Sequence, residues 1–243
     1  MQFYDVYVRR FGELYKASYI PRFVRDDGSP HIKKDYENKK IGDKFLNNII
    51  RAKSKILEYA LCNDFEYFFT GTLDKDKYSR DDLETFYKDF SHFIRNIRSY
   101  YDTDIKYLFV PELHSDGVSW HIHGLISGIP DNQLFSFEYP NHPLKLVKKG
   151  YKYWDKYTNK FGFCSVGVIK SKEAVSRYIT TYITEDLGHA IPKGSHLYYC
   201  SRGLNTSSLV FQGNVTSLPD GCYKGEFCST IWTDSLSFFD DVF

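Results

Sequence analysis

The sequence predicts an α+β fold built around an antiparallel central sheet, with helices packed mainly on one face. Short runs rich in aromatic and β-branched residues alternate with longer segments in which apolar residues recur every three or four positions. Two short runs, residues 105–111 and 118–126, flank a turn at Ser115, Asp116 and Gly117, as in a hairpin. The order strand, helix, strand, strand, strand, helix suits an antiparallel sheet.

The first third of the chain follows the same patterns. Residues 3–19 alternate as a strand or hairpin does, and residues 22–39 have the charged, polar composition of a loop. A helix is expected from about Asp43, followed by a buried strand at 65–73. Ser79 and Asp82 form an S-x-x-D capping box for the helix that follows.

The later segments are less regular. Residues 127–153 are expected as an excursion, 161–169 as a strand, and 196–200 as a last strand. A single helix is expected from Ser171 to near Gly188. Residues 206–243 have weak periodicity and are expected as an extension and tail. We therefore expect one domain over 1–243, with its core at about 44–205.

The bulk composition excludes several classes of protein. The 32 Lys and Arg nearly balance the 31 Asp and Glu, so any contact with DNA must be local. Five cysteines without a CxxC pair or signal peptide favour a reducing cytoplasm, and no apolar run reaches the roughly 18 residues of a membrane span. No GxxxxGK[ST] loop is present, so neither a nucleotide cofactor nor ATP-driven unwinding is expected.

A candidate metal site lies on the central hairpin. His121 and His123 alternate along a predicted strand, which points both imidazoles to one face. Glu112 ends the preceding strand, and the hairpin returns it beside them. Two imidazoles and a carboxylate suit Mn²⁺ or Mg²⁺, although Zn²⁺ is chemically possible. The alternative is a pair of half-buried, hydrogen-bonded histidines with a structural role.

A pair of tyrosines provides a candidate nucleophile. Tyr178 and Tyr182 stand four residues apart on the predicted helix, so their hydroxyls share one face. Attack by a tyrosine on DNA leaves a phosphotyrosine diester, which preserves the bond energy for rejoining. The alternative is an accidental pair in a tyrosine-rich chain, because the same stripe also holds apolar core residues.

A basic and aromatic stretch could bind a single strand, with lysines near phosphates and rings stacked on bases. An ordinary solvated loop is the alternative. The candidate DNA-binding residues are Lys148, Lys149, Lys152, Tyr153, Trp154, Lys170, Lys172 and Arg202.

Three segments together resemble motifs I, II and III of the HUH endonucleases. They are Phe69 to Asp74, Val110 to Gly117 with Trp120 to Leu125, and Tyr178 to Thr184. The likeness covers roughly residues 44–205. It is greatest to rolling-circle replication initiators of small single-stranded DNA phages, microvirus-like, and of related prophages and plasmids of Gram-positive bacteria.

This resemblance implies a sheet core of the RRM or ferredoxin-like type and a divalent ion, Mg²⁺ or Mn²⁺, bound by Glu112, His121 and His123. It also implies nicking and joining of single-stranded origin DNA through a 5′-phosphotyrosine, with host helicase and replication proteins as partners. The chain departs from the family at one point. Members often carry lysine three residues after each tyrosine, whereas this chain has Thr181 and Glu185. Lys170 and Lys172 could supply that charge.

Rival functions remain open from the sequence. A plasmid relaxase or single-strand transposase would use the same chemistry. A noncatalytic DNA-binding regulator on a decayed scaffold would explain Thr181 and Glu185. A hydrolytic metalloenzyme would leave the tyrosines with a structural role only.

Overall fold

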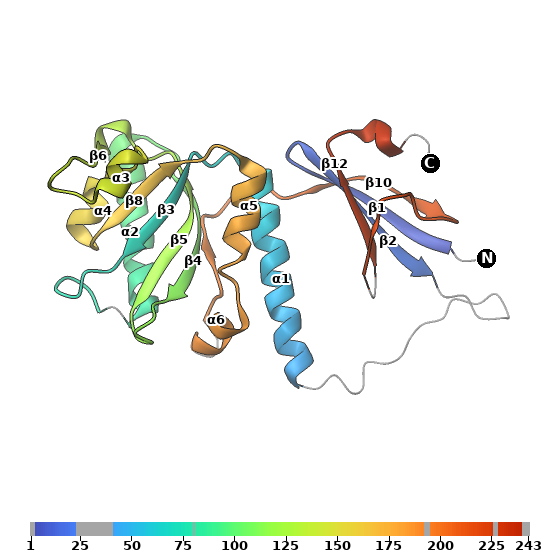
Figure 1. Ribbon diagram of the computed structural model, residues 1–243, viewed down its shortest axis with the longest axis horizontal. Coiled ribbons are helices and arrows are strands. Elements are labelled where there is room, and N and C mark those ends of the chain that lie inside the picture. Colours follow the sequence, from blue (N-terminus) through green and yellow to red (C-terminus); the bar gives the residue numbers. More distant parts are fainter. Residues whose placement is uncertain (1–2, 23–40, 80, 192–194, 226–227, 240–243) are drawn as a thin grey trace. The chain divides into compact units, whose positions relative to one another are not determined.

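The computed structural model of the chain describes residues 3–22, 41–79, 81–191, 195–225 and 228–239 (Figure 1). The chain divides into two compact units, Asp43–Leu204 and Met1–Gly42 with Asn205–Phe243. The expected core at 44–205 matches the first unit within one residue. The expectation of a single domain stays a prediction, because a compact unit need not fold separately. The expected loop at 22–39 lies outside the described residues beyond Arg22.

The larger unit contains a seven-stranded sheet in which every pair of neighbours is antiparallel. This arrangement confirms the predicted α+β class and the antiparallel central sheet. The strands in spatial order are β6 (Leu134–Ser136), β7 (Lys152–Trp154), β8 (Cys164–Val168), β3 (Tyr67–Thr72), β5 (Trp120–Ser127), β4 (Lys106–Leu113) and β9 (Tyr199–Cys200).

Six α-helices occur among the described residues. Their bounds are α1 (Ile41–Cys62), α2 (Leu83–Tyr101), α3 (Leu144–Lys148), α4 (Asp155–Lys160), α5 (Lys172–Thr180) and α6 (Glu185–Ala190). A short 3-10 turn, η1 (Asp131–Gln133), precedes β6. None of the helices that the structure describes is long and apolar enough to cross a membrane.

Helix α2 begins one turn later than the predicted capping box indicates. Asp82 is the N-cap, and its carboxylate accepts a hydrogen bond from the backbone N–H of Thr85 at 2.9 Å. The hydroxyl of Ser79 instead donates to Asp81. Ser79 as the cap is therefore wrong, because Asp82 itself reaches the free N–H groups of the first turn.

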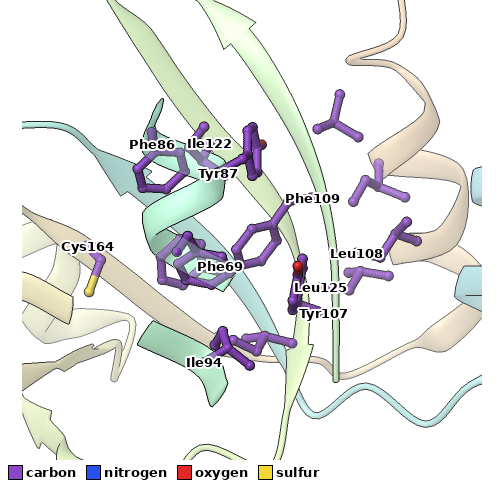
Figure 2. Close-up of a cluster of buried hydrophobic side chains, with 14 of the residues drawn as sticks. Phe69, Phe86, Tyr87, Ile94, Tyr107, Leu108, Phe109, Ile122, Leu125 and Cys164 are labelled. Carbon is purple, nitrogen blue, oxygen red and sulfur yellow. The ribbon is translucent and has the colours of Figure 1, made fainter. Parts of the chain in front are cut away.

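An aromatic core fills the space between α2, α4 and one face of the sheet. The ring of Phe109 lies 5.0 Å from Phe69 on β3 and 5.3 Å from Phe90 on α2. Tyr157 of α4 contacts Phe69 edge to face at 5.0 Å. Figure 2 shows Phe69, Phe86 and Phe109 gathered on this side of the strands. Much of the high aromatic content is therefore core, whose burial stabilises the fold.

The smaller unit holds a five-stranded antiparallel sheet formed by both ends of the chain (Figure 1). Its order is β10 (Ser208–Val215), β1 (Phe3–Phe11), β2 (Leu14–Arg22), β12 (Ser229–Thr233) and β11 (Tyr223–Lys224). A further 3-10 turn, η2 (Leu236–Phe239), follows β12. The hairpin at 3–19 is confirmed. Strands β10 to β12 fall where the sequence indicated only an extension, because β10 and β12 pair with strands at the other end of the chain.

Gly124 allows β4 and β5 to pack closely. A Cβ at this position would lie 2.3 Å from the carbonyl oxygen of Leu108 and 2.4 Å from the ring of Phe109. We predict that Gly124→Ala lowers the free energy of unfolding by about 1–3 kcal/mol, measured by urea denaturation. Ser136→Ala on the exposed edge strand is the control, with an expected change within about 0.5 kcal/mol. Equal midpoints for both variants would contradict the close packing.

Candidate active site

The β4–β5 hairpin sets the positions of the three expected metal ligands. Glu112 pairs with His121, and Val110 pairs with His123, in an unbroken antiparallel register. Residues paired across antiparallel strands present their side chains on the same face. Glu112, His121 and His123 therefore share one face, opposite to the face that carries Phe109 and the aromatic core.

Glu112 and His123 are in direct contact. Nε2 of His123 lies 2.7 Å from Oε2 of Glu112, and its Nδ1 lies 3.3 Å from the hydroxyl of Thr70 on β3. The imidazole is 11% exposed, whereas the carboxylate is 49% exposed. His123 is thus held from behind by Thr70 and directed at a carboxylate that solvent can reach.

Burial lowers the pKa of His123, and His121 acts in the same direction, whereas the neighbouring Glu112 carboxylate opposes the change. The net effect favours the neutral imidazole. A neutral imidazole has a free lone pair, which a metal ligand requires.

His121 lies slightly apart from the other two side chains. Its ring is 6.3 Å from that of His123 and 4.7 Å from that of His114, between ring centres. Among the described residues, no three His, Cys, Asp or Glu side chains are already close enough to hold an ion. The donor types still fit Mn²⁺ or Mg²⁺, since an imidazole and a carboxylate already meet and a second imidazole flanks them.

The expected tyrosine helix is interrupted. Helix α5 ends at Thr180, and Tyr182 lies in the turn before α6. The hydroxyls of Thr180 and Thr181 donate to the carbonyls of Arg177 and Tyr178, both at 2.7 Å. The single helix to Gly188 is therefore wrong, because threonine side chains bond to the last turn. Thr184 then caps α6 by accepting from the N–H of Leu187 at 3.0 Å.

The two tyrosine hydroxyls nevertheless meet. They lie 2.7 Å apart, within hydrogen-bonding distance. The ring of Tyr182 stacks on His123 at 4.3 Å and 11°, while the ring of Tyr178 rests against Phe68 at 5.4 Å. Tyr178 is 51% exposed, and Tyr182 is partly buried. The tyrosine pair therefore lies directly over the histidine and glutamate of the hairpin.

Burial raises the pKa of Tyr182 well above the usual value for tyrosine, with further contributions from its hydrogen bond to Tyr178 and from the charge of Glu112. The phenol of Tyr182 is therefore protonated at neutral pH. It can donate its proton in the hydrogen bond to the oxygen of Tyr178.

Two cavities meet at Tyr178. One, of about 340 Å³, is lined by Glu112, Tyr178, Tyr182 and residues of the turn and α6. The other, of about 890 Å³, is lined by Lys148, Lys149, Lys170, Phe68, Tyr151 and Tyr178 among others. Tyr178 is thus the side chain shared by the carboxylate side and the basic side of the site.

The structure brings together some of the predicted DNA-binding residues. Lys148, Lys149 and Lys170 line the same cavity. Lys152 and Tyr153 lie on β7, two strands from β3, and both are partly exposed. These residues remain candidates for DNA contact.

Three other candidates are placed differently. Trp154 is fully buried and packs on Phe93 at 5.1 Å, so it cannot stack on a base and is withdrawn as a DNA-binding residue. Lys172 forms an ion pair with Asp64, which occupies its charge locally. Arg202 is exposed but lines neither of the two cavities.

Residue analysis missed three side chains that shape the site. Thr70 supports His123, Phe68 contacts Tyr178, and Tyr151 lines the basic cavity. The alternation of the strand at 65–73 places Phe68 and Thr70 on one face, so this signal was present in the sequence. Their neighbours on β5 could only be found from the strand order.

The fold and the site together define an α+β protein with a tyrosine pair above a histidine and a glutamate on an antiparallel sheet. Residues 66–187, about half of the chain, match the model of a family of replication-associated proteins, the ORF2 type. The chain belongs to this family, and the matched segment contains both tyrosines and all three expected metal ligands. Membership supports a role in the initiation of DNA replication, with DNA as the partner. Neither curated proteins nor solved structures give a significant match.

The turn of the hairpin generates a prediction about pH. Hydrogen bonds from Ser119 and Val118 hold the pKa of Asp116 well below its usual range. A carboxylate with a lowered pKa stabilises the fold above the unfolded value of about 4, and this contribution is lost as the pH falls below that value.

We therefore expect the free energy of unfolding of the wild-type protein to fall more between neutral pH and pH values near 3 than that of Asp116→Asn. The amide keeps an acceptor oxygen but does not titrate. Denaturant unfolding at several pH values measures the difference. Parallel pH profiles for the two proteins would show that Asp116 does not secure the turn.

Proposed function

We propose that this protein initiates rolling-circle replication as a metal-dependent endonuclease and strand transferase. It would cut single-stranded origin DNA at a specific site and remain joined to the 5′ phosphate through a tyrosine. The observation that carries this proposal is the position of Tyr178. Its side chain borders both the carboxylate cavity and the basic cavity, and it contacts the second tyrosine.

Tyr178 is the first nucleophile in this proposal, and Tyr182 supports it. Tyr178 is the more exposed of the two and is the one that lines the lysine cavity. A phosphate held by Lys148, Lys149 and Lys170 would therefore meet Tyr178 first. Lys170 offers a positive charge near this tyrosine, although the family's lysine positions hold Thr181 and Glu185.

Glu112, His121 and His123 would hold the divalent ion, Mn²⁺ or Mg²⁺. When bound, such an ion withdraws charge from phosphate oxygens and makes phosphorus easier to attack. Thr70 fixes the orientation of His123, so that Nε2 faces the ion site. The hydrogen bond between Glu112 and His123 would be replaced by contacts with the ion.

The reaction exchanges one phosphodiester for another. The oxygen of Tyr178 forms a bond to phosphorus and loses its proton, while the bond to the 3′ oxygen breaks and that oxygen takes up a proton. The freed 3′ hydroxyl primes synthesis, and its later attack on the phosphotyrosine rejoins the strand. Tyr182, one hydrogen bond away, would serve in a second cleavage. Unwinding is left to a host helicase.

An assay for covalent adducts tests this proposal. The protein is incubated with a labelled single-stranded DNA library and Mn²⁺, and the products are separated under denaturing conditions. We expect an adduct with the wild-type protein, none with Tyr178→Phe or His123→Ala, and a smaller loss with Tyr182→Phe. Removing the ion with a chelator should abolish the adduct.

Tyr100→Phe is the matched control, because Tyr100 is an exposed tyrosine on α2 outside the site and its variant should form the adduct normally. Binding of DNA without any adduct would favour the noncatalytic regulator. Cleavage to free phosphate ends without a protein link would favour a hydrolytic metalloenzyme.

The basic cavity makes a separate prediction about salt. Each phosphate contact that is lost should reduce the slope of log affinity against log salt by about 0.7 for a single strand. We expect Lys148→Ala with Lys149→Ala to weaken single-strand binding and to flatten this slope by about one to two contacts' worth. Lys145→Ala removes an exposed lysine of α3 that does not line the cavity, and should change neither quantity. Equal slopes for all three proteins would exclude the cavity as a phosphate site.

A further inference from the structure

An aromatic ladder lies on the outer strands of the sheet that carries the candidate active site. Phe137 stacks on Phe163 at 5.7 Å and 22°, and it also contacts Tyr153 at 5.4 Å. Tyr153 in turn stacks on Phe135 at 5.8 Å and 27°. His142 packs against both Phe137 and Tyr153. Phe163, Phe137, Tyr153 and Phe135 thus form one connected row of rings, here called the aromatic ladder.

The two ends of the ladder are exposed. Phe135 is 46% exposed, and Phe163 is 44% exposed, whereas Phe137 between them is buried. Large apolar rings on a protein surface carry a cost in water unless a partner covers them. Phe135 lies on edge strand β6, where its ring has no packing role comparable to that of the core aromatics.

Strand register places the ladder on the same face as the histidines. His123 pairs with Thr70, and Thr70 pairs with Ser165. Because Lys152 pairs with Val166, the next residue, Tyr153, lies beside Ser165, and Tyr153 pairs with Phe135. A single row therefore runs across the sheet from His123 to Phe135. Four strand spacings of about 4.8 Å separate its ends by roughly 19 Å.

A neighbouring row connects the ladder to the basic cavity. Phe68 pairs with Gly167, and the ring of Tyr151 covers Gly167 so closely that a Cβ there would lie 2.9 Å from it. Both Phe68 and Tyr151 line the lysine cavity, and the Nζ of Lys149 lies 5.6 Å from the Tyr151 ring. The phosphate-binding side chains and the exposed rings thus adjoin on one face.

We propose that the aromatic ladder is a stacking platform for unpaired bases of the DNA strand whose phosphate is bound beside Tyr178. This inference rests on the proposed function for the identity of the strand. The platform is continuous with that site, and its length suits a few nucleotides beyond the cleavage point. Rings arranged in this way bind single strands with little preference for sequence, because every base has a face to stack. Duplex DNA, whose bases are already stacked, would gain nothing from it.

The test measures binding of a short fluorescent oligothymidylate by anisotropy in the absence of divalent ions, so that cleavage is not required. We expect Phe135→Ala and Phe163→Ala each to weaken binding by about tenfold or more, since stacking contributes strongly per base. Phe135→Trp should restore binding, because a larger ring stacks at least as well. Affinity for a duplex of the same length should not change.

Tyr100→Ala is the matched control, because this tyrosine is 76% exposed but lies on α2, away from the ladder. Its affinity should equal that of the wild-type protein. Photocrosslinking with oligonucleotides containing iodouracil gives a second readout, in which the ladder predicts crosslinks to residues 135–163. Wild-type affinity in both Phe→Ala variants, or crosslinks confined to other segments, would overturn the platform.

These outcomes separate the platform from the proposed function. Weaker binding by the ladder variants, together with no covalent adduct from the wild-type protein, would retain the platform and reject the nicking reaction. Normal binding by those variants, together with a Tyr178 adduct, would retain the reaction and reject the platform.

Discussion

The candidate site depends on the register of the β4–β5 hairpin. Asp116 and Gly117 close its turn, where Asp116 accepts two backbone hydrogen bonds and Gly117 adopts a positive φ of 71°. This turn pairs Glu112 with His121. A slip of one residue would move the histidines to the opposite face, into the aromatic core. A local turn thus controls the chemistry of the whole face.

The two faces of the sheet have separate tasks. One face is closed by α2 and α4 through tightly packed rings, and Gly124 lets the central strands approach without a side chain between them. The other face carries Glu112 and His123, which are held in place by that rigid packing. Polar side chains keep a defined geometry more readily on packed strands than on loops, and this is the condition that a preorganised site requires.

The break between α5 and α6 brings the tyrosines over the hairpin. Tyr182 leaves the helical path at Thr181 and stacks on His123, while Tyr178 stays on α5 and faces the lysine cavity. In a continuous helix the two phenols would share similar surroundings. The turn gives them different burial, and this difference is the physical basis for assigning them different roles.

The sequence by itself determined the hairpin, the shared face of Glu112, His121 and His123, and most helices and strands, because these depend on turn chemistry and periodicity over a few residues. It could not determine that Trp154 is buried, that the lysines at 148, 149 and 170 share one cavity, or that both chain ends form one sheet. Only the tertiary structure decided these, since each depends on strand order and on contacts between segments far apart in the chain. The aromatic ladder is of the same kind, because its rings come from β6, β7 and the segments beside them.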